Sequence, residues 1–246
     1  MPELSVNAIP RALWRRWIPS PVTNLGVHLA TGQSADFLRR LRDGEEIFWG
    51  AAIAFYETEK RAMLSPSFAR QSQGMSSWTI VKELYAMAQA QGGSGDFLQE
   101  MTFIELKHRL AELLLMRVDK MSMATSIEAR VPFLDHKLVE FAMQIPTAWK
   151  IRNGTGKHIL RLAVQSVIPA EILQRTKQGF CGSADNMLQP RVMDKLVADI
   201  RSSKFLGELL RPEAIEHLTA PTYRAANSFK LWNLWNLALW HKCWFQ

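Results

Sequence analysis

Cysteine and long hydrophobic runs are scarce in this chain of 246 residues, and we recognise no strand-type alternation or internal repeat. The two cysteines, Cys181 and Cys243, have no metal-ligand spacing and form no disulfide framework, so we expect free thiols. The longest apolar run, residues 48–56, is too short to span a bilayer, and the N-terminus lacks the charged-then-apolar order of a signal peptide. These absences argue against secreted and membrane classes, and we expect a cytoplasmic protein.

Positive charge is in excess, with 30 lysines and arginines against 23 acids, a net charge of +7 and a pI near 9.6. This excess indicates an anionic partner without specifying its kind. The basic residues are scattered, apart from Arg15-Arg16 and residues 39–42, and do not form a stripe with interleaved aromatics. We therefore do not expect a nucleic-acid reader. With 48% hydrophobic and 22% charged residues, the chain has a globular composition.

Apolar residues at helical spacing predict a mainly α chain. We expect a loosely docked N-terminal segment over residues 1–33 and a body over 34–246. Helices are expected from a Ser34 cap to Gly44, over 45–64, from Ser77 to the glycine-rich connector 92–95, from a Thr102-x-x-Glu105 capping box through Asp119, from an Asp135 cap to Pro146, after Lys157, from Pro169 to Gln174, and from Pro190, Pro212 and a Ser228 cap onward.

Residues 117–135 concentrate charge among small and apolar residues, where isolated charges are costly. The stretch should form a helix end, a turn at Pro132 and the next helix start, a corner that can aim side chains into one cleft. Alternatively, Arg117 and Arg130 neutralise the neighbouring carboxylates in a structural salt-bridge cluster. Residue types alone favour this second interpretation, because catalytic ion pairs are a minority.

Asn153-Gly-Thr-Gly-Lys157 is the second suggestive feature. Two glycines permit close backbone approach, Thr155 can cap a helix, and Lys157 would lie in the first turn, where free N–H groups favour an anion. The segment is not a Walker A loop, since Ile151 and His158 stand where that motif needs Gly and Ser or Thr. Gly-x-Gly-Lys alone is a weak signal, and a solvated lysine at a helix start is the simpler alternative.

The order of these motifs resembles one family closely. The matching pattern is Arg117-x-Asp119-Lys-x-Ser122-Met-Ala124-x-x-x-Glu128-Ala-Arg130-Val-Pro132-Phe-Leu-Asp135, Leu138-Val-Glu-Phe-Ala142, Ile145-Pro146, Lys150, Gly154-x-Gly156-Lys157-x-x-Leu160-Arg161, Ile168-Pro169, Ile172 and Arg175-x-Lys177-Gln-Gly-Phe180. It is similar to the glutamine-dependent asparagine synthetases, most densely over residues 100–180. The resemblance implies the helical C-terminal portion of an α/β adenine-nucleotide α-hydrolase-like (ATP-pyrophosphatase) domain.

The resemblance also implies a chemistry. A carboxylate substrate, aspartate or a related acid, attacks the α-phosphorus of ATP to give an acyl-adenylate and pyrophosphate. Ammonia derived from glutamine then displaces AMP to form the amide. The expected cofactors are ATP and Mg²⁺. By the family's pattern Lys157 is the catalytic contact to the phosphates, and the residues expected to bind substrate or ATP are Arg117, Asp119, Glu128, Arg130 and Lys177.

Several family segments have no counterpart here: the Ser-Gly-Gly-x-Asp-Ser phosphate loop, the magnesium-binding aspartates, the Gly-Glu-Gly-Ala-Asp-Glu segment and the glutaminase domain with its cysteine. We therefore expect no metal ligands in this chain, and no activity without a half that carries the phosphate loop and glutaminase, in the same or another polypeptide. The alternative is a non-catalytic binding or scaffold protein derived from the same fold.

Overall fold

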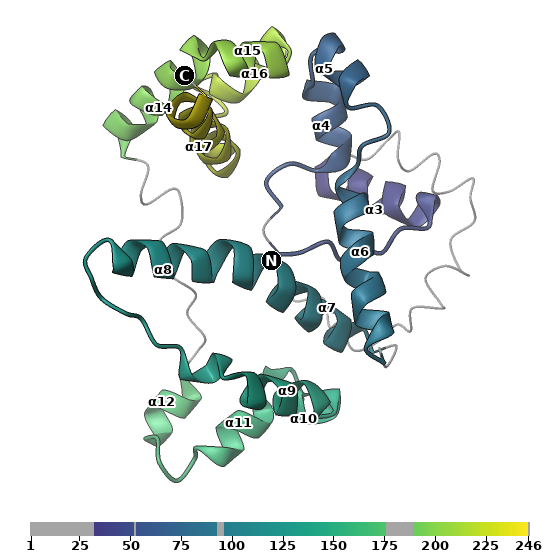
Figure 1. Ribbon diagram of the computed structural model, residues 1–246, viewed down its shortest axis with the longest axis vertical. Helices are drawn as coiled ribbons and strands as arrows, with labels where there is room; N and C mark the ends of the chain where they lie inside the picture. The colour runs from purple at the N-terminus through teal and green to yellow at the C-terminus, as the bar shows by residue number, and fades with distance from the viewer. Residues whose placement is uncertain (1–31, 52, 93–95, 176–188, 246) are drawn as a thin grey trace. The chain divides into compact units, whose positions relative to one another are not determined.

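A computed structural model describes residues 32–51, 53–92, 96–175 and 189–245 (Figure 1). The expected N-terminal segment lies outside these ranges except for its last two residues, and Lys177 and Cys181 also lie outside them. The elements are α3 (Gly32–Asp43), α4 (Glu57–Met63), α5 (Pro66–Gln71), α6 (Ser77–Ala90), α7 (Phe97–Glu105), η1 (Leu106–Leu115), α8 (Met116–Met123), η2 (Pro132–Leu134), α9 (His136–Gln144), α10 (Thr147–Lys150), β1 (Ile151–Arg152), β2 (Thr155–Gly156), α11 (His158–Ala163), α12 (Ala170–Gln174), α14 (Pro190–Ser202), α15 (Lys204–Leu209), α16 (Pro212–Thr219) and α17 (Ser228–Phe245). The expectation of a mainly α chain is confirmed.

The described residues divide into two compact units. One unit contains residues 41–51, 78–92 and 96–175, and the other contains residues 32–40, 53–77 and 189–245. Each unit is therefore assembled from stretches that are separated in the sequence.

The first unit is built on one continuous helical rod formed by α7, η1 and α8, coloured teal in Figure 1. Asp96 caps its start by accepting hydrogen bonds from the backbone N–H groups of Leu98 and Gln99 at 2.9 and 3.2 Å. The expected capping box at Thr102 is wrong, because the helix has already begun and the Thr102 hydroxyl donates back to the Leu98 carbonyl at 2.7 Å. The middle of the rod is a π-helix, η1, a form rarely seen beyond a single turn.

Helix α6 packs through Val81, Tyr85 and Ala88, the face that its spacing predicts. The Tyr85 hydroxyl donates to the Phe48 carbonyl at 3.0 Å. The expected helix over 45–64 is wrong for its first half, because Gly50 takes a φ of +119° that a right-handed helix cannot accommodate. Helical structure begins only at Glu57.

The second unit has its hydrophobic core where α14, α15, α16 and α17 meet. Its fully buried side chains include Leu196, Ile200, Leu206 and Leu231. Pro190 and Pro212 stand at the first position of α14 and α16, as expected from their fixed φ. Ser228 is the first residue of α17, one position inside the helix from the expected cap.

Helices α4 and α5 are tied to this core by backbone pairing. Leu64 and Leu210 form an isolated antiparallel bridge, and the Arg211 N–H donates to the Met63 carbonyl at 2.8 Å. The Ser65 hydroxyl donates to the Glu208 carbonyl at 2.6 Å. A short segment near residue 64 is thus an integral part of a unit formed mainly by the last quarter of the chain.

Candidate functional site

The glycine-rich segment before α11 forms a β-hairpin whose two strands have two residues each. Strands β1 and β2 pair antiparallel, with Ile151 opposite Gly156 and Arg152 opposite Thr155. Asn153 and Gly154 form the turn with φ angles of +50° and +73°, which suits the primed turn favoured in short hairpins. Thr155 is therefore a strand residue, and the expected helix cap at this position is wrong.

Lys157 follows the hairpin directly and holds a left-handed backbone, with φ +58° and ψ +32°. It precedes α11 as the capping residue, so the expected position within the first helical turn is one residue out. Its side chain is exposed and has no hydrogen bond or ion pair with any described residue. The ammonium group is consequently free to meet an anion arriving from solvent.

His158, the first residue of α11, is partly buried. Its Nε2 has no hydrogen-bond partner in the described part of the chain. Nothing in its spacing had marked it as a site residue.

The charged corner is open to solvent. Arg117 and Asp119 lie on α8, and Glu128 and Arg130 lie in the loop that follows, all four exposed. Within the described residues the only ion pair among them joins Arg130 to Glu128 at 2.9 Å, with side chains 81% and 68% exposed. Such a pair contributes little stability, so it does not explain why the corner concentrates these charges.

Asp135 ends the corner as the cap of α9, as expected. Its carboxylate accepts from the N–H groups of Lys137 and Leu138 at 3.0 and 3.3 Å. Within the described residues this carboxylate caps the helix and forms no ion pair with an arginine, so the expected salt-bridge cluster does not include it.

The stretch of sequence that carries these charged residues also exposes many large hydrophobic side chains. The large exposed hydrophobic side chains between residues 116 and 172 are Met116, Val118, Met121, Met123, Ile127, Val131, Phe133, Leu138, Phe141, Trp149, Leu160, Leu162, Val167 and Ile172. Apolar exposure on this scale is typical of a surface that another structure covers. We call these fourteen exposed side chains the open face; they belong to the same stretch of sequence as Arg117, Asp119, Glu128, Arg130 and Lys157.

Lys150, the last residue before the hairpin, connects α10 to α9. Its ammonium group donates to the Met143 carbonyl at 3.3 Å, and burial lowers its pKa, an effect partly offset by Asp96. The Thr147 hydroxyl in turn donates to the Asp96 carboxylate. Lys150 thus has a structural role, joining the end of α9 to α10 and the strand that follows.

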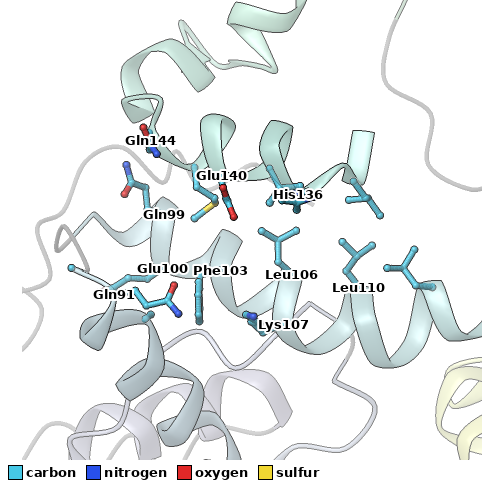
Figure 2. A pocket seen from close by; sticks show the side chains of 16 residues that line it. Gln91, Gln99, Glu100, Phe103, Leu106, Lys107, Leu110, His136, Glu140 and Gln144 are labelled. Atoms are coloured by element: carbon cyan, nitrogen blue, oxygen red, sulfur yellow. The ribbon is translucent and has the colours of Figure 1, made fainter. Parts of the chain in front are cut away.

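A cavity of about 810 Å³ lies elsewhere in the same unit, between the end of α6, the α7–η1 rod and α9 (Figure 2). Leu106 and Leu110 extend from the rod toward α9, and Gln99 and Gln144 approach one another from opposite sides. The residues lining this cavity include none of the predicted site residues. The cavity is therefore not the site indicated by the sequence.

The described residues bring no three His, Cys, Asp or Glu side chains close enough to hold a metal ion. Among these same residues, no helix has the length and apolar character needed to cross a membrane. Lys177 lies outside the described ranges.

Comparison with known proteins identifies the family. The model of the asparagine synthase family matches residues 7–242. Asparagine synthetase [glutamine-hydrolyzing] 1 of Bacillus subtilis is 26% identical over 200 residues, and a putative asparagine synthetase of Mycobacterium tuberculosis is 30% identical over 201 residues. Human asparagine synthetase is 39% identical over 82 residues, which cover 31% of this chain and 15% of the human protein.

The bacterial matches cover 80% of this chain but only 30% and 29% of the two relatives. The chain thus spans about 30% of the length of these curated relatives. No solved structure matches it.

Proposed function

Because this chain belongs to the asparagine synthase family, we propose that it supplies one wall of an ATP-dependent amide-forming site. In this reaction a carboxylate, aspartate or a related acid, attacks the α-phosphorus of ATP and releases pyrophosphate. Ammonia derived from glutamine then attacks the acyl carbon, and AMP leaves. The observation that carries the proposal is Lys157, an exposed cation directly after a defined hairpin, which pairs with no described residue and lies within the family's motif.

We assign the ammonium group of Lys157 to contact the phosphates of ATP. The transition state of adenylation spreads negative charge over phosphoryl oxygens, so a fixed cation contributes most there. Its ammonium group needs no rearrangement of existing bonds before it contacts a phosphate, since no described residue holds it. Removing one such electrostatic contact costs on the order of 100-fold or more in rate.

The corner residues Arg117, Asp119, Glu128 and Arg130 are assigned to substrate or ATP positioning. Three features support this: their exposure, the single weak ion pair among them, and their match to the family motif. We assign Lys177, by the motif alone, to a further anion contact.

The complementary half, carrying the phosphate loop, the Mg²⁺ ligands and the glutaminase, is proposed to lie in the same or another polypeptide. The described residues offer no cluster for Mg²⁺, so no step is assigned to the metal here. When bound with ATP, the ion would offset charge on the phosphates. The open face supports the need for such a half, because it leaves fourteen large apolar side chains uncovered.

The test is complementation. The purified chain is mixed with the part of the Bacillus subtilis relative that lies outside its match to this chain, together with ATP, Mg²⁺, aspartate and ammonium. Asparagine and pyrophosphate are then quantified. We expect both products from the mixture, and Lys157→Ala should reduce their rate by at least 100-fold. Lys204→Ala, an exposed lysine of the second unit, is the matched control and should keep the full rate.

Product formation no faster than with either part alone would refute the proposal. An unchanged rate in Lys157→Ala would refute the assignment of Lys157 while leaving the amide-forming reaction in place. Ammonium is used as the nitrogen donor so that glutamine hydrolysis does not limit either outcome.

A non-catalytic scaffold is the second candidate function. It is favoured by the open face, which could serve a different partner, and by the position of the 810 Å³ cavity away from the candidate residues. Under this alternative the chain would bind neither ATP nor pyrophosphate, and complementation would yield no product.

A further inference from the structure

Arg161 lies one helical turn beyond Lys157 and contacts two separate segments. Its Nε donates to the Gly156 carbonyl at 3.3 Å, and its NH1 donates to the Leu173 carbonyl in α12. Its backbone N–H donates to the Lys157 carbonyl at 3.0 Å. One residue therefore connects the end of the hairpin, the turn at Lys157 and the following helix.

The turn at Lys157 needs such support. A left-handed conformation is unfavourable for a lysine, which carries a Cβ. The hairpin before it has strands of only two residues, and α11 after it has six, so neither element is stable alone. The backbone geometry at Lys157 therefore depends on contacts that join the hairpin to α11 and both of them to the rest of the unit.

We propose that Arg161 is the positioning residue for Lys157, acting through the Gly156 carbonyl and not by contacting the phosphate. This inference rests on the proposed function, in which Lys157 binds the phosphates. The planar guanidinium can reach two carbonyls in fixed directions, which a lysine ammonium on a flexible stem cannot reproduce. With donors on both carbonyls, Arg161 holds the residue before Lys157 against α12.

Pyrophosphate binding by the full chain provides the test. Inorganic pyrophosphate is titrated calorimetrically into the unaltered chain, Lys157→Gln, Arg161→Met, Arg161→Lys and the double variant. We expect Arg161→Met to weaken binding about 10-fold, and Arg161→Lys to recover little of the loss despite its charge. The double variant should bind no more weakly than Lys157→Gln, because Arg161 acts only through Lys157.

Arg152→Met is the matched control. Arg152 is an exposed arginine of the same hairpin, and its side chain forms no hydrogen bond or ion pair with any described residue. The Arg152→Met substitution removes the same charge near Lys157, and we expect it to change the affinity for pyrophosphate less than twofold. The hydrogen-exchange rate of the β2 amides is a second measurement. This rate should rise about 10-fold in Arg161→Met and stay unchanged in Arg152→Met.

The outcomes separate the two proposals. If the unaltered chain does not bind pyrophosphate, the phosphate contact and the role of Arg161 in it are both overturned. If Lys157→Gln loses binding but Arg161→Met does not, the inference alone is overturned. A double variant weaker than Lys157→Gln would show that Arg161 meets the anion directly, which also overturns it. Arg161→Lys retains the charge and keeps the test valid if Arg161→Met does not fold.

Discussion

Gly154 allows backbone strain in the hairpin to be measured without a change in packing. The residue has a φ of +73°, and a Cβ built on it meets no atom within 4 Å. Replacing it with alanine therefore adds no clash, and the cost is the left-handed backbone alone, about 1–2 kcal/mol for an L-residue. This corresponds to about a 5–30-fold increase in the population of the opened hairpin.

Gly156 is the matched control for this substitution. It lies two residues away in the same hairpin, and a Cβ there also meets nothing within 4 Å, but its φ is outside the left-handed region. Gly156→Ala should be neutral or stabilise the hairpin by about 0.4–1 kcal/mol, because it restricts the unfolded chain. Gly154→Asn should fall between the two alanine variants, since asparagine tolerates the left-handed region better than alanine.

The assay is native-state hydrogen exchange of the amides in residues 151–156, with pyrophosphate affinity as the functional readout. Faster exchange in Gly154→Ala and unchanged or slower exchange in Gly156→Ala are expected. Equal effects of the two alanines would refute the claim that the turn geometry, and not the bulk of an added methyl group, determines the hairpin.

Three further predictions concern stability. Leu231→Ala removes a fully buried side chain from the core of the second unit and should cost about 2–5 kcal/mol in urea denaturation followed by tryptophan fluorescence; a loss below 1 kcal/mol would contradict this core. Hydrogen bonds from Lys195 and Trp235 hold the pKa of Asp199 below its ordinary value of 3.8. The ionised carboxylate therefore stabilises the fold above about pH 4, and this contribution is lost as the pH falls through the lowered pKa. Asp199→Asn should therefore lower the melting temperature at pH 6 more than at pH 3, and an equal decrease at both would argue against the effect. Asp135→Ala should cost about 1 kcal/mol through loss of the α9 cap, whereas Asp119→Ala should leave the urea midpoint unchanged.

Local signals were the most reliable part of the sequence. Asp135 caps α9, Pro190 and Pro212 open their helices, and Gly44 follows α3 with a positive φ, each as expected. These features depend on the chemistry of one or two residues and their immediate neighbours, so tertiary contacts had little chance to override them. Ser34, expected as a cap, lies inside α3.

The wrong expectations come from longer-range competition. Residues 45–56 were expected to be helical from their apolar content, but Trp49 stacks on Trp78 at 5.7 Å and the Ala51 N–H donates to Glu105. These partners lie 29 and 54 residues away, and the spacing of one segment cannot reveal them. The Asn153-Gly154 turn is a readable hairpin signal, but Thr155 and Lys157 beyond it favoured the prediction of a capped helix start that binds an anion.

The candidate site shows the same division between local sequence signals and long-range contacts. The position of Lys157 could be identified from the motif, whereas its left-handed backbone could not. Arg161 belongs to the matched motif, but the role that we propose for it depends in part on the Leu173 carbonyl in α12, twelve residues away. How the corner on α8 and its loop relates to Lys157 is likewise a question of tertiary structure that residue order does not answer.

The bridge between Leu64 and Leu210 has a consequence for synthesis of the chain on the ribosome. Ser65 and its partner Glu208 are separated by 143 residues, which take about 7–29 s to translate at about 5–20 residues per second. During this interval α4 and α5 have emerged but their partners in α15 do not yet exist, and residues 78–175, which belong to the other unit, are synthesised in between. The nascent chain therefore has to keep the segment around residue 64 from aggregating, and the second unit can fold only after α17 has emerged.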